Sequence, residues 1–546
     1  MAKGLSYQPL PNFGINGLNL QANPSTLDPT WLTDADNIVL RESGRISFRK
    51  GLKQKVVPSG TAIGSMVEHN DQGTNKIFAS HGTSIYTIDF TSPDAAFPTG
   101  DDDTKHTVAN SSGDWQFVNF NNRLHCFHTG VVPQRYDGSL GSGVKWTAHA
   151  TDPASISTLF DPSCGMGYYG KLWCGGVTEA PDVVFYSVLL DGDDWTGSGS
   201  GYIDLKTVWG TDEIVAIAPF FGKLVIFGKN NIVVYDEPRS GGTLALNEVI
   251  KGIGCVSRDS VQAIADDLVF LSNTGLRSLA RTTEKDKLPM QELSLAVTDT
   301  LIRNIGNSTN VKSVYVENEG IYIMSFVDLN INYVFDFKHK TTRNTPRVTT
   351  WSFDTDREPA SLIYTNLYSG LLAGQKDGGI SGYEGYYDTD LAWVDSAASY
   401  TNAPFTSDIS SGWIPVGTAV TASLLKRIIL VLEGGSGATL GLKWYKDFNS
   451  EPSETTTVNL RPVTTGSTSL WGDSSSLYGA TTATHTHDSA VHPASSKYTP
   501  IFGLQEYKRP LTGSARYLKL NMAVESNGYD AMIQNLTLLH KEGKIR

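Results

Sequence analysis

Histidines near the C-terminus are the first residues whose spacing suggests chemistry. His485, His487 and His492 lie with Thr486 and Asp488 in one polar stretch. Alternate residues of a strand point to the same face, and imidazole is a common ligand of zinc and iron. Two histidines from each of three chains around a symmetry axis would complete an octahedral site. Solvated loop histidines are the simpler interpretation, and we therefore predict no metal site and no cofactor.

Clusters of carboxylates suggest a different chemistry. A glycosidase needs one carboxylic acid and one carboxylate base or nucleophile across the scissile bond. The clusters lie near Gly, Thr and Ser, where Asp favours hydrogen bonds to the local backbone of a turn. The middle cluster is also weak as a calcium loop, because Tyr202 stands where a twelve-residue EF loop has its bidentate Glu. We predict turns at all three clusters, which are Asp101, Asp102 and Asp103; Asp191, Asp193 and Asp194; and Asp354, Asp356 and Glu358.

Three familiar catalytic motifs do not occur in the sequence. Each Gly-Lys pair is followed by Leu, Asn or Ile, so there is no G-x-x-x-x-G-K-[ST] phosphate loop. H-E-x-x-H and G-x-S-x-G are also missing, which leaves metalloprotease and α/β-hydrolase interpretations without an anchor. We therefore predict that the protein is not an enzyme and has no catalytic residues.

The composition favours many short strands. Hydrophobic residues make up 40% of the 546 residues, which is enough to bury a large core. Charged residues supply only 18%, and the 53 glycines indicate many turns. The net charge of −12 argues against attraction of the whole protein to nucleic acid or to an anionic membrane. Any contact with DNA would be local or purely geometric.

The cysteines and the apolar runs bear on compartment. Cys126, Cys164, Cys174 and Cys255 form neither a C-x-x-C pair nor a dense framework, so we predict four buried thiols. The N-terminus lacks the apolar run of a secretory signal. The longest apolar stretches are far shorter than the ~20 residues that cross a bilayer. We expect a cytosolic site of synthesis and no membrane span.

A hairpin pattern repeats through the middle of the chain, where the cysteines and the acidic clusters lie. Between about residue 60 and residue 390, β-rich runs alternate with turns that contain Asn, Gly or Asp. The intervals between repeats are 44 to 53 residues, close to the roughly 40 to 50 of propeller blades. The first apolar residues of the successive second strands are Ile77, Leu124, Leu172, Leu224, Leu268, Ile321 and Leu371.

The pattern predicts an all-β fold with a β-propeller of six or seven blades at residues 61–395. Residues 1–60 are predicted to form an N-terminal extended or β segment that joins the propeller or an adaptor. Helical signal is strongest at residues 288–306, where Leu293, Val297 and Leu301 are spaced for one helical face. A chance series of hairpins in an irregular β protein is the alternative, because the repeats share no Trp-Asp or Gly-Gly motif.

The pattern changes after residue 400 to longer alternating runs. Residues 396–546 are predicted to form a separate C-terminal β domain resembling a sandwich. Within it, residues 464–499 are rich in Ser, Thr, Gly and Ala. Loops beyond ~15 residues in compact domains are usually functional or disordered, so this long polar excursion is expected to reach a neighbour or a partner.

Both ends of the chain resemble one protein family. Near the N-terminus, GLNLQANPSTLDPTWLTDADNIVLRESGRISFRKGLKQ is similar to the opening of tail nozzle or hub proteins of short-tailed bacteriophages, also called packaged-DNA stabilisation or tail tubular proteins. Their order is a Gly-rich start, a Gln and Pro segment, a helix-like link ending in Asn, and a strand closing in an Arg-Lys-Gly or Arg-Pro turn. The segments KRIILVLEGGSGATLGLKWYKDF and ARYLKLNMAVESNGYDAMIQNLTLLHKEGKIR look like their terminal β domain. Residues 464–499 match no part of this pattern.

The resemblance implies a structural role in the virion tail after synthesis in the host cytoplasm. Such proteins form a ring, commonly a homohexamer, below the portal and its adaptor, which retains packaged DNA and serves as its conduit on ejection. Expected partners are portal-adaptor proteins, tail fibre, spike or needle proteins, and passing double-stranded DNA. A basic strip would contact the adaptor or DNA phosphates unless it is only a solvated strand face; it comprises Arg41, Arg45, Arg49, Lys50, Lys53 and Lys55.

Two other functions compete with this one. A carbohydrate-binding or glycosidase-type propeller would use the polar excursion or an acidic cluster on the host surface. A monomeric propeller scaffold would bind a cellular partner without self-association.

The net charge bears on the tail function. Acidic walls that repel phosphate would suit a DNA conduit, and the net charge of −12 is consistent with that hypothesis.

Overall fold

The protein is described as a computed structural model that divides into two units. The first, here the terminal unit, consists of Met1–Gly51, Glu384–Leu391 and Asn402–Arg546, and the second, the propeller unit, of Leu52–Tyr383 and Ala392–Thr401. The described residues are all except 1–4, 42–44, 57, 89–102, 237–243, 280–291, 309, 355–356, 369, 385–388, 391–402, 417–420, 435–438, 461–504, 526–530 and 544–546.

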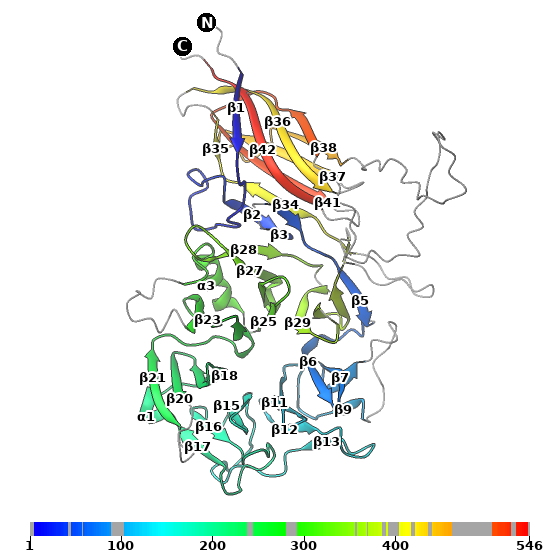
Figure 1. The fold of residues 1–546 in the computed structure, drawn as a ribbon, viewed down its shortest axis with the longest axis vertical. Coiled ribbons are helices and arrows are strands. Elements are labelled where there is room, and N and C mark those ends of the chain that lie inside the picture. Colours follow the sequence, from blue (N-terminus) through cyan, green and yellow to red (C-terminus); the bar gives the residue numbers. More distant parts are fainter. Residues whose placement is uncertain are drawn as a thin grey trace, which may run out of the picture. The chain divides into compact units, whose positions relative to one another are not determined.

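The propeller unit contains six blades of three or four antiparallel strands, the sheets of a six-bladed β-propeller (Figure 1). The first three blades are β6 (Ile63–Asp71), β7 (Thr74–His81), β8 (Ser84–Ile88) and β9 (Lys105–Thr107); β10 (Gln116–Phe120), β11 (Arg123–His128), β12 (Val131–Tyr136) and β13 (Trp146–Ala148); and β14 (Cys164–Tyr168), β15 (Lys171–Gly175), β16 (Val183–Tyr186) and β17 (Gly201–Asp204). The other three are β18 (Ile214–Phe220), β19 (Lys223–Gly228), β20 (Asn231–Asp236) and β21 (Ala245–Lys251); β22 (Gln262–Ile264), β23 (Asp267–Ser272) and β24 (Gly275–Ser278); and β29 (Pro359–Thr365), β30 (Gly370–Gln375), β31 (Ile380–Tyr383) and β5 (Leu52–Val56).

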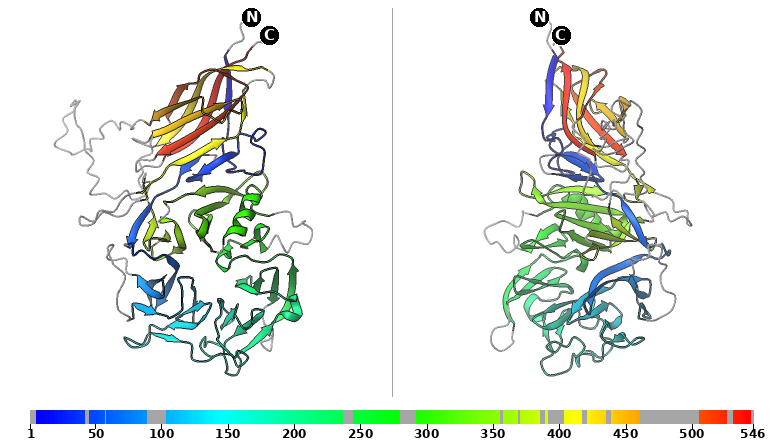
Figure 2. Two further views of the ribbon diagram at one scale, coloured as in Figure 1. Left: turned by 180° about the vertical axis from the view of Figure 1, so that it is seen from behind. Right: turned by 45° about the vertical axis from the view of Figure 1, so that its right-hand side comes forward.

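One further set of four strands, which belongs to a larger sheet, lies between the fifth of these blades and the last (Figure 2). It consists of β25 (Val311–Val316), β26 (Ile321–Phe326), β27 (Ile331–Lys340) and β28 (Pro346–Trp351). Strand β25 contacts β22 on one side and β29 on the other, while β29 contacts β6. The first strand of each set therefore lies next to the axis. All seven predicted second strands exist, as β7, β11, β15, β19, β23, β26 and β30.

The last blade is built from both ends of the propeller unit. Strand β5 pairs antiparallel with β31, so that Val56 lies opposite Ile380. Val56, Ile380 and Leu372 pack in one apolar cluster with Ile63 and Ile77 of the first blade. Each blade needs a neighbour to bury its faces, and this cluster joins the first blade to the last.

The conformation of the hairpin turns explains why the strands could be predicted from the sequence. Two-residue β-turns of type I′ require positive φ at both central residues and favour Asn and Gly. Asn121 and Asn122 have φ of 47° and 59° in the turn between β10 and β11. Tyr169 and Phe221 take the same conformation, with φ of 50° and 46°, each before a glycine. Turn signals therefore mark the starts of β11, β15 and β19.

Helices are few among the described residues. The predicted helix at residues 288–306 overlaps α3 (Thr298–Asn307), which buries Leu301; residues 288–291 lie outside the described part of the chain. The others are the short α1 (Lys206–Trp209), η2 (Arg258–Ser260) and η3 (Val327–Leu329). In the described part of the chain, no helix has the length and apolar character needed to span a bilayer. All four cysteines are free and buried, as predicted.

The terminal unit contains larger sheets, each with one buried face, a pattern typical of packed sheets. One has the order β3-β4-β42-β36-β39, with β1 beside β42 and β40 beside β36; the other strands follow the order β2-β34-β41-β37-β38, with β35 beside β41. The first group is β1 (Leu5–Leu10), β3 (Ile38–Leu40), β4 (Ile46–Phe48), β36 (Ser423–Gly434), β39 (Gln505–Pro510), β40 (Ser514–Ala515) and β42 (Ala531–Lys541). The second is β2 (Leu32–Asp36), β34 (Ser407–Ser411), β35 (Ile414–Pro415), β37 (Thr439–Lys446), β38 (Glu454–Asn459) and β41 (Tyr517–Glu525), and a separate pair is β32 (Thr389–Asp390) and β33 (Ala403–Pro404).

Candidate functional site

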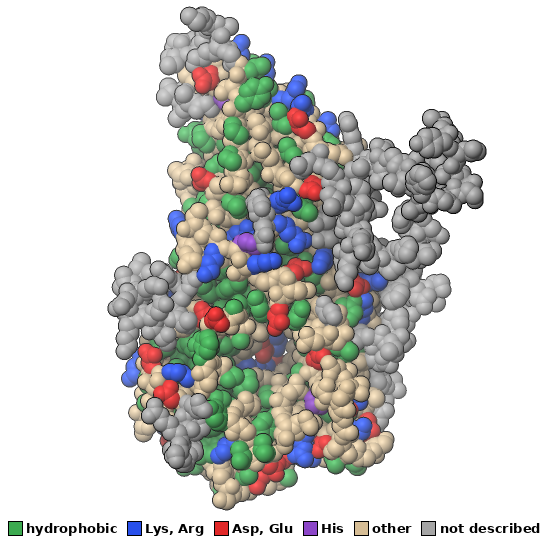
Figure 3. Space-filling view, viewed as in Figure 1, with side chains coloured by type: hydrophobic (Ala, Val, Ile, Leu, Met, Phe, Trp, Pro, Cys, Tyr) green, Lys and Arg blue, Asp and Glu red, His purple; other side chains and the backbone are tan. Residues whose placement is uncertain are grey.

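The axis of the propeller contains a cavity of about 230 Å³. Its lining residues come from the beginnings of β6, β10, β25 and β29, from β22, and from η2 just before β22. Figure 3 shows charged side chains inside a hollow at the centre of the propeller. Concave sites with a few convergent polar groups are the usual place for ligands, so this axial cavity is the first candidate site.

A network of two cations and two carboxylates lies at the axial cavity. Arg258 Nη2 is 2.8 Å from Asp114 Oδ1, and Arg258 Nε is 3.0 Å from Asp259 Oδ1. Lys312 Nζ is 2.5 Å from the same Asp114 oxygen and 2.6 Å from Asp259 Oδ2. Because Asp114 precedes β10 while Lys312 lies on β25, the network joins strands from different parts of the ring. We call these four residues the axial ion network.

Both carboxylates of the axial ion network are held in the charged form. Burial alone raises the pKa of Asp259, but Arg258 and Lys312 outweigh it and hold this pKa well below its usual range. The same two cations outweigh burial at Asp114 and lower its pKa. Burial lowers the pKa of Arg258, but Asp259 and Asp114 outweigh it and raise this pKa above its usual value. At neutral pH the network therefore contains no carboxylic acid that could protonate a leaving group.

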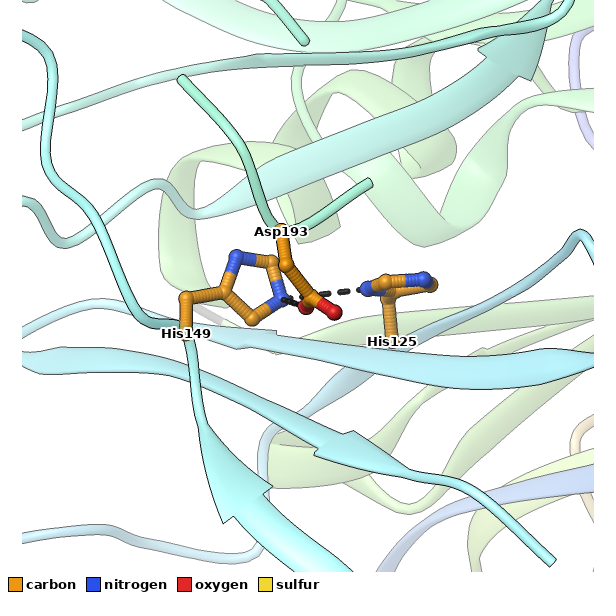
Figure 4. Close-up of side chains that lie close together, drawn as sticks. All are labelled: His125, His149 and Asp193. Carbon is orange, nitrogen blue, oxygen red and sulfur yellow. Dashed lines mark hydrogen bonds and ion pairs between the residues drawn. The ribbon is translucent and has the colours of Figure 1, made fainter. Parts of the chain in front are cut away.

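A second cluster lies between the second and third blades (Figure 4). His125 is on β11, His149 follows β13, and Asp193 lies in the loop between β16 and β17. His125 Nδ1 and His149 Nε2 are 3.0 Å apart, and His149 Nε2 is 3.6 Å from Asp193 Oδ1. All three side chains are buried. Two histidines and one carboxylate are a ligand set that iron and zinc accept.

The hydrogen bonds of this cluster argue against a metal ion. Trp195 Nε1 donates to His149 Nδ1 at 3.1 Å, so the proton of neutral His149 lies on Nε2, which donates to His125 Nδ1. A metal on His149 Nε2 would move that proton to Nδ1, where it would face the Trp195 N–H. Arg123 and Arg135 also bond Asp193 Oδ2, and their positive charge opposes a divalent cation.

Purified protein is therefore expected to retain no zinc at this cluster. We expect a zinc content of about one-tenth of an ion per chain or less after dialysis, because a zinc ion on His149 would break the hydrogen bond from Trp195 to His149. Elemental analysis measures the content, and a melting curve with added zinc chloride provides the second readout. One zinc per chain, lost in His125→Asn, would contradict this assignment.

The basic strip predicted from the sequence is divided between the two units. Arg41, Arg45, Arg49 and Lys50 belong to the terminal unit, and Lys53 and Lys55 belong to the propeller unit. Arg49 is fully buried: its Nε donates to Asn37 Oδ1 at 2.7 Å, and its guanidinium lies 3.7 Å above the Phe405 ring. Arg49 therefore has a structural position, with no exposed surface for an adaptor or a phosphate.

The other members of the strip also have neighbours. Arg45 is 45% exposed and lies 3.8 Å from Glu433, while Lys55 Nζ lies 4.8 Å from the Tyr368 ring centre. Three further members are half-buried, namely Arg41, Lys50 and Lys53. Arg45 is thus the member with the most clearly exposed charge, and partner contacts at these positions stay a prediction.

The prediction of turns at the acidic clusters is confirmed in part. Asp194 Oδ1 accepts from the backbone of Thr196 and Gly197, which is a turn. Asp193 instead bonds the arginines described above, and Glu358 is buried and accepts from Asn332. Asp101, Asp102 and Asp356 lie outside the described residues, as do His485, His487, His492 and the whole of residues 464–499.

Sequence reasoning did not find either of the two clusters. The members of the axial ion network are separated by 144 and 198 residues in two of its contacts, and no local motif marks such a set. The adjacent Arg258 and Asp259 before a predicted strand were the only local sign. The three residues of the histidine cluster likewise come from three different hairpins.

The fold and site define a β-propeller protein with an additional β unit. No protein-family model matches the sequence, and no curated protein matches it. Among solved structures, the WD40 domain of Pan2 from Neurospora crassa is similar, with 8% sequence identity and a TM-score of 0.38. That match covers 61% of this chain and 96% of the WD40 chain.

Proposed function

We propose that this protein is a structural component of a short bacteriophage tail, a nozzle or hub that acts by assembly and without catalysis. One observation carries the proposal: the two chain ends that resemble such proteins form a single unit. Strand β1 pairs with β42 from Leu5 opposite Lys541 to Leu10 opposite Leu536, and β4 also pairs with β42. The resemblance at both chain ends therefore applies to one folded unit, the terminal unit.

The charge distribution supports a conduit. The terminal unit has 18 Lys and Arg and 18 Asp and Glu, whereas the propeller unit has 26 and 38. The whole net charge of −12 therefore belongs to the propeller unit. In the proposed homohexameric ring, an acidic propeller surface toward the lumen would repel phosphate and let DNA slide. The ring would bind a portal adaptor above and fibre, spike or needle proteins elsewhere.

The glycosidase alternative receives no support from the axial cavity. A glycosidase needs one carboxylic acid that stays protonated until it reacts. Asp114 and Asp259 both have lowered pKa values beside Arg258 and Lys312, so neither is protonated near neutral pH. Binding of carbohydrate without hydrolysis is a separate question, because it needs no acid.

Assembly is tested by measuring the solution mass over a range of concentrations and by imaging the same sample in negative stain, alone and with portal-bearing particles. We expect rings, formed alone or on the particles. A monomer that leaves the particles unchanged would rule out the nozzle proposal. Arg45→Glu should weaken attachment to particles if the basic strip faces the adaptor, and Arg516→Glu is the matched control at another exposed arginine of the terminal unit.

A further inference from the structure

The axial cavity contains buried hydrogen-bonding groups that the protein does not use. Trp115 is 2% exposed and Ser65 is 8% exposed, and both line the cavity. Among the described residues, Trp115 Nε1 and Ser65 Oγ have no hydrogen-bond partner. A buried polar group without a partner costs about 1–3 kcal/mol, so such groups in a native structure call for a ligand or ordered water.

Two glutamines at the same cavity each have one end free. Gln116 Oε1 accepts from the Gly165 backbone at 2.7 Å, which leaves its NH₂ group as a donor. Gln262 Nε2 donates to the Ser313 carbonyl at 3.2 Å, which leaves its oxygen as an acceptor. The cavity therefore offers both donors and acceptors. Hydroxyl groups match such a mixture, because each hydroxyl donates one hydrogen bond and accepts others.

The charges at the cavity select against an ionic ligand. Arg258 and Lys312 are each paired with both Asp114 and Asp259, so the axial ion network has no net charge. A phosphate or a carboxylate would have to compete with these carboxylates for the cations. A metal ion would likewise have to displace a cation from a carboxylate. A neutral ligand leaves all of these ion pairs in place.

We propose that the axial cavity binds a neutral, hydroxyl-rich small molecule, a polyol or a single sugar ring. The volume of about 230 Å³ exceeds the roughly 150 Å³ of a protein cavity that holds one benzene ring, so a ligand of one ring fits. Trp115 supplies an indole N–H donor for a hydroxyl group, while its ring packs in an apolar cluster with Leu124 and Cys126. This inference goes beyond the proposed tail function and holds for a monomer or for a ring.

The test uses the full-length chain and saturation-transfer NMR titrations with D-glucose, D-galactose, D-mannose and glycerol. Glucose 6-phosphate is the charged match to glucose. At least one neutral compound should bind saturably at concentrations up to about 50 mM, and more tightly than glucose 6-phosphate. Ser65→Ala and Trp115→Phe should each weaken that binding roughly tenfold, because each removes one buried hydrogen-bonding group.

Matched controls exist in the terminal unit. Ser423 and Trp444 are also buried, and their Oγ and Nε1 atoms have no partner among the described residues. Ser423→Ala and Trp444→Phe should therefore leave ligand binding unchanged. The proposal is overturned if no neutral compound binds the folded protein, if glucose 6-phosphate binds more tightly, or if the cavity variants bind as well as the controls. Gln262→Leu is the replacement variant if Trp115→Phe does not fold.

Discussion

Arg258→Met is expected to lower the free energy of unfolding of the propeller by about 1.5–3 kcal/mol, the range of hydrogen bonds to charged groups. The guanidinium is paired with Asp114 and Asp259 and also donates to the Ser163 carbonyl at 2.6 Å. Its removal leaves Asp259, with a side chain 26% exposed, and Asp114, with a side chain 58% exposed, to share Lys312 as their remaining cation. It also leaves the Ser163 carbonyl without this donor. Urea unfolding followed by tryptophan fluorescence measures the loss.

An exposed ion pair provides the control for this prediction. Lys229 and Glu213 form an ion pair with side chains 57% and 55% exposed. Exposed pairs contribute about 0–1 kcal/mol, so Lys229→Met should change stability little. Equal effects of the two variants would show that the axial ion network does not stabilise the propeller. High salt should leave most of the loss in Arg258→Met, because the side chains of Arg258 and Lys312 are only 11% and 7% exposed and such charges are screened less than exposed ones.

The propeller is expected to lose stability as the pH falls from 6.5 to 5, through the histidine cluster. Burial, together with Arg135 and Arg123, lowers the pKa of His125 to about 3, and burial and His125 hold the pKa of His149 well below its usual range. In the unfolded chain both histidines titrate near 6.5. Between these values the unfolded state binds more protons, so stability is full above pH 6.5 and declines as the pH falls.

The expected loss is about 1.4 kcal/mol per pH unit for each histidine, or roughly 4 kcal/mol for both at pH 5. His125→Asn combined with His149→Asn should flatten this dependence, because Asn offers a polar atom near the Nδ1 position and does not titrate. Urea unfolding at several pH values gives the slope, and His339→Asn is the control, since His339 is 29% exposed in its side chain. An unchanged slope in the double variant would contradict the assignment.

The repeat pattern could be read because it depends on local rules. Asn121 and Asn122 adopt positive φ at low cost, and the apolar residue that follows each such turn begins a buried strand. Leu172 and Leu224, predicted as starts of second strands, are fully buried. Turn chemistry and strand alternation act over a few residues, so a single sequence is enough to reveal them.

The closure of the ring and the composition of both clusters depended on long-range contacts. Strand β5 joins β31 across more than three hundred residues of chain, and no local signal in Leu52–Val56 identifies that partner. Arg49 illustrates the same limit: its charge predicted a surface contact, whereas Asn37 and Phe405 enclose it. A charged residue has the same sequence signal whether its partner is solvent or a buried acceptor.

From its residues, this chain could be recognised as an all-β protein with blade-length repeats, buried thiols and a distinct C-terminal β pattern. The meeting of Asp114, Arg258 and Lys312 at the axis required the folded ring, and the meeting of His125 and His149 with Asp193 required two neighbouring blades. The physical reason is range: hydrogen-bonded turns and alternating burial are local, whereas ion pairs and cavities form between strands that only closure of the propeller brings together.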